Sequence, residues 1–319
     1  MKKHAQSICV FAPATVANVS CGFDVFGFAV DEPGDEVILT LREEKGVFIK
    51  AIHGDGGKLS LDPDKNTAGV AAQSFLKAFA SDAGVEIELF KGLPIGSGLG
   101  SSAASAAAVL FGLNRLLGHP ADGKDLLHFG LQAEKVACGS AHGDNVIPSL
   151  LGGFVLIRSY DPLEIYHFPI PEELFCTLIY PNIEIETRNA RELLPTSIPL
   201  QTAIRQWANT AGFAAGLCLS DYQLLSRSMV DLVAEPVRAQ YIPKFYELKD
   251  TAQKAGALGS SISGSGSTVF ALCRGKDTAK RVCDAMSSLY QNASISFKSW
   301  ISPINSEGPR IVNLESKNQ

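Results

Sequence analysis

The chain has 319 residues, of which 46% are hydrophobic and 19% charged, and its formal net charge is −5. This length is ample for a buried core and favours two domains over one. The negative charge argues against a nucleic-acid surface or an anionic-membrane surface, so neither partner is expected. The seven cysteines show no Cys-x-x-Cys spacing, and no apolar run is long enough for a signal peptide or a membrane helix. We therefore expect free thiols in a cytoplasmic protein.

In chain order, the first half of the sequence predicts strands and one amphipathic helix before a glycine-rich loop. The helix is indicated by Val70, Ala71 and Phe75, which recur at helical spacing. The expected elements are a strand at 8–12, a turn over 13–25, a strand at 26–30, a hairpin of strands 36–42 and 47–52 through 43–46, the helix at 67–80 and a strand at 85–90.

Residues 91–108, KGLPIGSGLGSSAASAAA, combine a glycine loop with the start of a helix. Alanine is the best helix former, and Ser101 or Ser102 is expected to cap the first turn through its hydroxyl. The helix should reach about Leu117 and end at Gly118. A helix N-terminus offers unpaired N–H groups and partial positive charge, and glycines let an anion approach the backbone. The stretch therefore predicts a phosphate-binding loop.

The loop differs from the commonest phosphate-binding motifs. A Walker A loop needs Gly-Lys followed by Ser or Thr, and no Gly-Lys pair here meets that condition. A dinucleotide fingerprint needs a glycine where Ser101 stands, and the catalytic triplets of protein kinases are absent. A plain glycine-serine linker is disfavoured, because linkers do not run into an alanine-rich helix.

A second helix is expected over residues 125–136, with Glu134 near its end. Such a glutamate is usually a solvated surface residue, but it could also bind Mg²⁺, which takes one or two carboxylates beside a nucleotide. A polar cluster follows, formed by His142, Asp144 and Asn145, ahead of an apolar run and Gly152-Gly153. The cluster has one histidine and no ligands at zinc spacing, which argues against zinc as the metal.

The composition changes around residues 169–171, where we place a boundary between domains 1–170 and 171–319. Arg188 and Arg191 are expected on one helix face. The predicted elements of the second half are a strand at 175–180, helices at 204–217, 222–232 and 245–254, a second glycine-serine stretch at 256–272 that enters a strand, a helix at 279–289 and a strand at 294–300. Strands and helices in irregular order favour an α+β protein over a doubly wound sheet.

Three separated motifs resemble, in order, those of the galactokinase–homoserine kinase–mevalonate kinase–phosphomevalonate kinase superfamily. They are Pro-Ala-Thr at 13–15, P-x-G-x-G-L-G-S-S-A-A at 94–104 and G-A-x-G-S-S-I-S-G-S-G-S at 256–267. Within it the chain is most similar to the homoserine kinases, through the segments APATVAN (12–18), GFD (22–24), HGDN (142–145), TRNAR (187–191), EPVR (235–238) and SPIN (302–305). One departure is the Val-Ser-Cys of residues 19–21, where that family usually has Leu-Gly-Pro.

The resemblance implies an N-terminal domain with a ribosomal-protein-type left-handed β-α-β fold and a C-terminal ferredoxin-like domain. It implies transfer of phosphate from ATP to L-homoserine with Mg²⁺, one step before threonine synthase, and a possible homodimer. The implied residues fall into four groups. They are, for ATP, Asn66, Pro94, Ile95, Gly96, Ser97, Gly98, Leu99, Gly100, Ser101, Ser102, Ala103 and Ala104; for the metal, Ser102 and Glu134; for substrate, Asn18, Asp24, Asn145, Arg191 and Arg238; and for catalysis, Asp144, Asn145 and Thr187.

The substrate assignment also has a physical basis. Homoserine is a small zwitterion, whose carboxylate suits the planar fork of Arg191 or Arg238 and whose ammonium suits Asp24. No residue is a secure general base, because Asp144 and Asn145 compete for that position. Phosphoryl transfer through a loose transition state depends mainly on positioning and charge stabilisation, so a strong base is not required.

Two alternatives stay open from the sequence. One is a kinase of the same superfamily that acts on another small alcohol, such as mevalonate or a sugar. The other, from a different class, is a catalytically inactive, ligand-sensing regulator. The presence of both Ser102 and Glu134 argues against the regulator.

Overall fold

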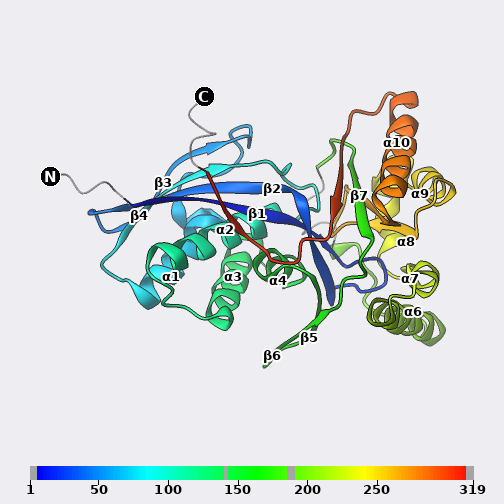
Figure 1. Cartoon of the computed structure of the whole chain (residues 1–319), viewed down its shortest axis with the longest axis horizontal. Helices are drawn as coiled ribbons and strands as arrows, with labels where there is room; N and C mark the ends of the chain where they lie inside the picture. The colour runs from blue at the N-terminus through cyan, green and yellow to red at the C-terminus, as the bar shows by residue number, and fades with distance from the viewer. Residues whose placement is uncertain (1–5, 140–142, 185–190, 314–319) are drawn as a thin grey trace.

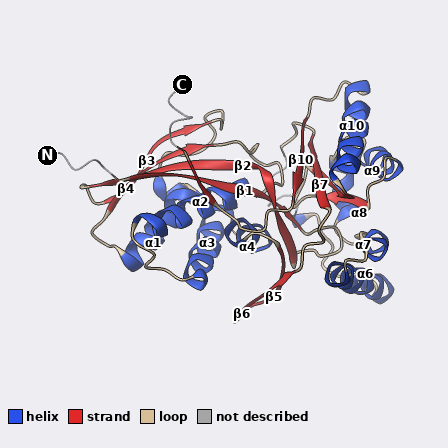
Figure 2. Cartoon of the chain, in the orientation of Figure 1, coloured by secondary structure: helices blue, strands red, loops and turns tan. Residues whose placement is uncertain are grey.

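The structure is a computed structural model that describes residues 6–139, 143–184 and 191–313 (Figure 1). Within these ranges it contains two sheets, each with its own helices, and Figure 2 shows the two halves side by side. The expected α+β class with two domains is confirmed.

The first sheet has seven strands, in the order β11-β1-β2-β4-β3, with β5 and β6 continuing from the first part of β2. The strands are β1 (Ser7–Ala17), β2 (Phe26–Arg42), β3 (Gly46–His53), β4 (Gly84–Phe90), β5 (Phe154–Tyr160), β6 (Leu163–Phe168) and β11 (Arg310–Val312). The parallel pair β3 and β4, with a helix between them in the chain, forms a β-α-β unit.

Helices cover one face of this sheet (Figure 1). They are α1 (Thr67–Phe79), preceded by the 3₁₀ turn η1 (Pro63–Lys65), α2 (Ser101–Leu116), α3 (Gly123–Cys138) and α4 (Gly143–Leu151). The second half of β2 alternates, so that Asp35, Val37 and Leu39 share its buried face. Leu39 lies against α2 at Gly112, which identifies this face as the one that the helices cover.

The second sheet has four antiparallel strands in the order β10-β7-β9-β8. Its strands are β7 (Leu174–Tyr180), β8 (Gly259–Ile262), β9 (Val269–Arg274) and β10 (Lys298–Pro303). The helices of this half are α6 (Leu200–Leu219), α7 (Tyr222–Ser228), α8 (Glu235–Arg238), with the 3₁₀ turn η2 (Ala239–Tyr241), α9 (Phe245–Lys254) and α10 (Lys276–Asn292). This strand order, with α10 between β9 and β10, is the ferredoxin-like arrangement that the resemblance implied.

The two halves share a hydrophobic core. Phe28 of β2 packs edge-on against Phe270 of β9, with ring centroids 6.1 Å apart, and Phe154 of β5 lies 6.0 Å from Phe213 of α6. All four side chains are fully buried. We propose to keep the domain boundary near residue 170, between β6 and β7, with β11 as a C-terminal segment that joins the first sheet.

The structure corrects the predicted hairpin. β2 and β3 follow one another in the chain, but β4 lies between them in the sheet. β3 therefore pairs in parallel with β4, and β2 pairs antiparallel with β4. The alternating pattern located β3 to within a residue at each end, but the strands predicted at 26–30 and 36–42 are one continuous strand, β2. The order of β2 and β3 in the sheet is set by a strand about 40 residues further along.

No helix in the described part of the chain is long and apolar enough to cross a membrane. The six cysteines whose side chains are described, Cys9, Cys21, Cys176, Cys218, Cys273 and Cys283, are free thiols. The thiol state agrees with the sequence expectation.

Candidate active site

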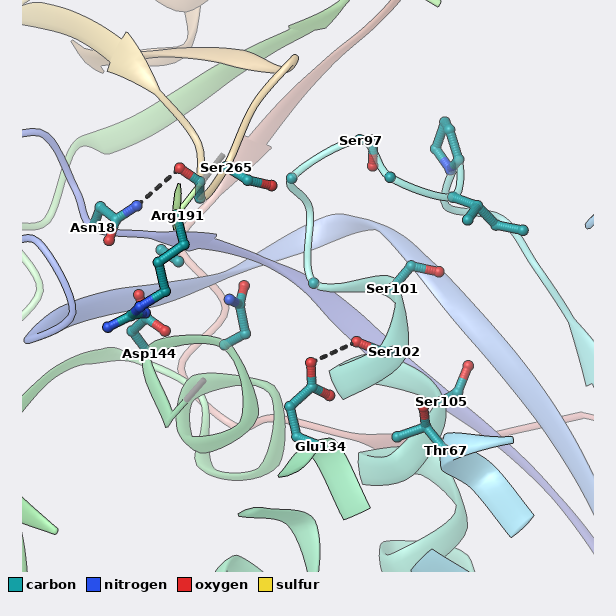
Figure 3. A pocket seen from close by; sticks show the side chains of 18 of the residues that line it. Asn18, Thr67, Ser97, Ser101, Ser102, Ser105, Glu134, Asp144, Arg191 and Ser265 are labelled. Atoms are coloured by element: carbon teal, nitrogen blue, oxygen red, sulfur yellow. Dashed lines mark hydrogen bonds between the residues drawn. The ribbon is translucent and has the colours of Figure 1, made fainter. Parts of the chain in front are cut away.

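A cavity of about 310 Å³ opens between the two halves of the chain (Figure 3). Its walls come from the turn after β1, the glycine loop before α2, the starts of α1 and α4, the end of α3, and the second half of the chain. Cavities of this size typically hold small molecules. This cavity is therefore the candidate active site.

The glycine loop reaches the cavity through backbone that only glycine adopts easily. Gly100 is the N-cap of α2 with φ +67°, and a Cβ there would come within 2.2 Å of the Thr15 hydroxyl. Gly98 has φ +80°, and a Cβ there would lie 2.3 Å from the carbonyl oxygen of Ser263. The second glycine-serine stretch thus packs directly on the first, and the Ser263 hydroxyl donates a hydrogen bond to Gly98 O at 2.7 Å.

The prediction that Ser101 or Ser102 caps α2 is wrong. Gly100 occupies the cap position and makes no side-chain cap bond. The Ser101 hydroxyl donates instead to Asp35 at 3.2 Å, and the Ser102 hydroxyl donates to Glu134 at 2.9 Å. The first N–H groups of α2 are therefore not satisfied by a side-chain cap, which leaves this helix N-terminus suited to an anion.

Ser97, in the middle of the loop, supports a ligand at this point. Its side chain is only 2% exposed, and its hydroxyl has no hydrogen-bond partner among the described residues. Ser97 also lines the cavity (Figure 3). Buried hydroxyls are normally hydrogen-bonded, so a polar ligand group is the partner that this residue lacks.

Glu134 and Ser102 point toward each other in the cavity (Figure 3). Glu134 lies on α3 and is 4% exposed, so its position there is not that of a solvated surface glutamate. One carboxylate and one hydroxyl are hard oxygen donors, which is the set that Mg²⁺ takes from a protein beside nucleotide phosphates. The donor set therefore fits the implied Mg²⁺.

The other end of the cavity carries opposite charges that pair with each other. Arg191 donates to both carboxylate oxygens of Asp24, at 3.3 and 2.5 Å. Arg238, 6% exposed, donates to Gly264 O at 2.8 Å, and burial lowers the pKa of its guanidinium. Both guanidinium groups lie near the ring of Phe23, with their central carbons 5.8 and 5.3 Å from its centroid. This end is suited to a ligand that carries both charges.

The turn that carries Asp24 has unusual backbone. Asn18, Val19 and Ser20 all have positive φ, as does Asp24. Left-handed conformations cost non-glycine residues roughly 1–2 kcal/mol each, so the turn is held by its surroundings. Asn18 provides part of that hold, because its amide donates to Gly264 O at 2.9 Å and accepts from the Asp24 N–H at 3.1 Å. Ser20 stands where the family that the sequence resembles usually has glycine.

Asp144 and Asn145, at the start of α4, face different neighbours. Asn145 accepts a hydrogen bond from the Thr15 hydroxyl at 2.7 Å, next to Gly100 of the glycine loop. Asp144 is 3% exposed and lies toward Arg191 (Figure 3). Burial, with the nearby charge of Asp24, raises its pKa from 3.8 to about 7. Asn145 is thus the member of the pair on the phosphate side.

Asp144→Asn is expected to change how stability depends on pH. Because the folded-state pKa is raised, the favourable contribution of the protonated carboxyl is complete below pH 3.8 and is lost as pH rises through about 7. The asparagine variant should gain stability relative to the wild type across that window, by at most about 4 kcal/mol at 1.4 kcal/mol per pKa unit. Thermal unfolding at pH 5, 6.5 and 8 measures this gap. Parallel profiles for both proteins, or a gap of equal size in the exposed variant Asp250→Asn, would contradict it.

Most of the predicted site residues meet in this cavity. The lining includes Asn18, Asp24, Asn66, Pro94, Ile95, Gly96, Ser97, Gly98, Gly100, Ser101, Ser102, Glu134, Asp144, Asn145, Arg191 and Arg238. Leu99, Ala103 and Ala104 are not part of the lining, because their side chains are fully buried in the core. Thr187 lies outside the described residues, as do His142 and Arg188.

Asn66 has an additional local role. Its side chain caps α1 by accepting from the Ala68 N–H at 3.0 Å, and it donates to Ser60 O. The side chain therefore holds the start of α1 where that helix meets the cavity.

The site residues predicted from the sequence leave out several contributors, of which Thr15, Phe23 and Lys91 are the clearest. Phe23 and Thr15 belong to motifs that the sequence analysis quoted, but only neighbouring residues were chosen from them. Lys91 directly precedes the loop and lines the cavity while its side chain is 2% exposed. A lysine at the end of a buried strand was the available signal.

Comparison with known proteins agrees with the geometry. The GHMP kinases N terminal domain model matches residues 66–153, and the GHMP kinases C terminal model matches residues 213–292. Together the two models cover more than half of the chain, including the glycine loop and the ferredoxin-like half. The chain belongs to the GHMP kinase family, a class of small-molecule phosphotransferases that use ATP.

Full-length relatives narrow the class further. The chain is 52% identical to a homoserine kinase of Chlorobium phaeobacteroides, over 95% of this chain and 98% of the relative. It is 49% identical to a homoserine kinase of Chlorobaculum tepidum, over 98% and 100%. The crystal structure of homoserine kinase from Cytophaga hutchinsonii superposes with a TM-score of 0.95 at 49% identity, covering 98% of this chain and 99% of that one. These matches place the chain with the homoserine kinases of the GHMP family.

Proposed function

We propose that this protein transfers the γ-phosphoryl group of ATP to the hydroxyl of L-homoserine, giving O-phospho-L-homoserine and ADP for threonine biosynthesis. The observation that carries the proposal is the division of one cavity into two chemically distinct ends. The glycine loop at one end suits phosphates. The charges at the other end, from Asp24, Arg191 and Arg238, suit a zwitterion.

Homoserine would replace an ion pair that the protein makes with itself. Asp24 and Arg191 form an ion pair and neutralise each other. An amino acid brings an ammonium for Asp24 and a carboxylate for the arginines, so both charges keep partners when the internal pair opens. Mevalonate has no cation for Asp24, and a sugar has no charge for either group. This end of the cavity therefore favours an α-amino acid.

The phosphate end supplies positioning and charge stabilisation. We propose that Ser102 and Glu134 hold Mg²⁺, which neutralises charge on the nucleotide phosphates when it is bound. Asn145, between Thr15 and the loop, would orient the attacking hydroxyl together with Thr187. In a loose transition state the hydroxyl proton can leave late, so Asp144 need not act as a strong base. Asp144 instead lines the amino-acid end beside Asp24 and Arg191.

The setting of this activity is part of the same proposal. We place the protein in the cytoplasm, where ATP and a reducing environment are found. A homodimer is proposed as its assembly on the resemblance to the homoserine kinases alone.

A coupled assay of ADP release tests the proposal. Purified protein should release ADP in proportion to L-homoserine and not with mevalonate or galactose at equal concentration. 4-Hydroxybutyrate, which lacks the ammonium, and 3-aminopropanol, which lacks the carboxylate, should be poor acceptors, because each leaves one charge of the opened pair without a partner. ATP binding without turnover on any of these alcohols would support a ligand-sensing regulator instead.

A further inference from the structure

Asp35 is a buried carboxylate directly beneath the glycine loop that none of the roles described so far uses. It lies on β2, on the face that the helices cover, in line with Val37 and Leu39. Its side chain is fully buried, at a position where the strand pattern otherwise places aliphatic residues. A buried charge is costly unless it is paired and hydrogen-bonded, so its contacts are informative.

These contacts reach both ends of the loop. On the N-terminal side, Asp35 Oδ1 accepts from the Leu93 N–H at 3.0 Å, and Asp35 Oδ2 forms an ion pair with Lys91. On the C-terminal side, Asp35 Oδ2 accepts from the hydroxyls of Ser101 at 3.2 Å and Ser105 at 3.3 Å. Residues 94–100 form the loop between these anchors. One carboxylate therefore holds the segment that enters the loop and the first turn of the helix that leaves it.

Lys91 completes the same cluster, and its ammonium is bonded within the protein. Besides Asp35, its ammonium donates to Ser101 O at 3.0 Å and to the Ser105 hydroxyl at 2.6 Å. An ammonium has three donors, and all three have partners inside the protein. Lys91 therefore acts on the loop through Asp35 and α2, although its side chain lines the cavity.

Electrostatics alone would give Asp35 an unfavourable effect on phosphate binding. A negative charge close to the N-terminus of α2 lowers the positive potential that attracts an anion. The benefit of Asp35 must then come from the loop geometry that it fixes. Removing the charge of Asp35 should therefore tighten phosphate binding if its role is electrostatic, and weaken phosphate binding if its role is to fix the loop.

We propose that Asp35 is a positioning residue for the nucleotide. By joining the two ends of the glycine loop, it holds the loop backbone and the α2 N-terminus in the arrangement that binds phosphates. It makes no contact with the ligand itself.

A second buried carboxylate offers a matched control on the other half of the site. Glu235, 7% exposed, pairs with Lys249 at 2.5 Å and accepts from the Ser261 hydroxyl at 2.5 Å. It begins α8, the short helix that ends with Arg238. Glu235→Gln removes a similar buried charge, but from the amino-acid end.

The test compares Asp35→Asn with Glu235→Gln by calorimetric titration with ADP in the presence of Mg²⁺ and by steady-state kinetics. Asp35→Asn should raise the Kd for ADP and the KM for ATP at least tenfold and change the KM for homoserine less than threefold. Glu235→Gln should instead raise the KM for homoserine at least tenfold and change the Kd for ADP and the KM for ATP less than threefold. The homoserine measurements rest on the proposed function, whereas the ADP titration does not. The proposed function and the proposed role of Asp35 can therefore fail separately.

If Asp35→Asn does not fold because it leaves Lys91 buried without its counter-charge, the double variant Asp35→Asn/Lys91→Met takes its place. That variant removes both charges and keeps much of the volume. Wild-type ADP affinity in a folded variant would overturn the proposal, and so would an equal rise in both KM values. Tighter ADP binding by Asp35→Asn would overturn it as well, because that result marks an electrostatic role.

Discussion

Glu134→Gln should lower kcat by about 100-fold or more while the protein keeps its fold. The side chain is 4% exposed on α3 and accepts the Ser102 hydroxyl at 2.9 Å, so the nearly isosteric amide fits the same space. What the amide loses is the negative charge that favours a divalent cation beside the phosphates. Charge stabilisation of this kind is typically worth several kcal/mol in phosphoryl transfer.

The measurement is kcat as a function of Mg²⁺ concentration, with circular dichroism to verify the fold. The variant should need much more Mg²⁺ to reach its own maximum rate. Glu247→Gln, on the exposed side of α9, is the matched control and should behave as wild type. Near-wild-type turnover of Glu134→Gln at limiting Mg²⁺ would remove Glu134 from the metal site.

Arg238→Lys should raise the KM for homoserine by roughly 10- to 150-fold, which corresponds to the loss of about 1.5–3 kcal/mol from a charge-assisted bidentate contact. Lysine keeps the charge but not the planar fork. The KM for ATP should stay within twofold, because Arg238 lies with Phe23 and Gly264 at the amino-acid end.

Initial rates with each substrate varied in turn give both constants. Arg274→Lys provides the control, since that arginine forms an exposed pair with Glu173. A rise confined to the KM for ATP would assign Arg238 to the phosphate side. Equal rises in both constants would indicate that the substitution disturbs α8 as a whole.

The glycine loop and the helix behind it could be predicted because their signals are local. The alanine run, the glycines and Gly118 specify α2 within a few residues, and the structure places that helix at Ser101–Leu116. The same local reasoning failed for β2 and β3, whose pairing depends on β4. It also failed for the cap of α2, because Ser101 is bound by Asp35, 66 residues earlier.

In the site, too, features with local sequence signals could be predicted and features that depend on distant residues could not. Motif residues such as Ser102, Glu134 and Asn145 could be named from sequence, and the structure places all three in one cavity. The contacts between site residues that lie far apart in the sequence could not be predicted. Nothing in the sequence indicates that Arg191 binds Asp24, since the two are 167 residues apart. Asp35 lies just outside the predicted strand 36–42, and nothing in the sequence places it beneath the loop.

The last strand of the first sheet has a consequence for how the chain is made. β11 pairs with β1, so that Phe11 lies opposite Arg310, and Arg310 also stacks on the Phe11 ring. A ribosome releases β1 roughly 300 residues before it releases its partner, at about 5–20 residues per second. For at least some 15 seconds, β1 presents an open edge of the kind that invites pairing with other chains. The sheet of the first domain is thus begun first, but it is completed only when the last strand of the chain has been synthesised.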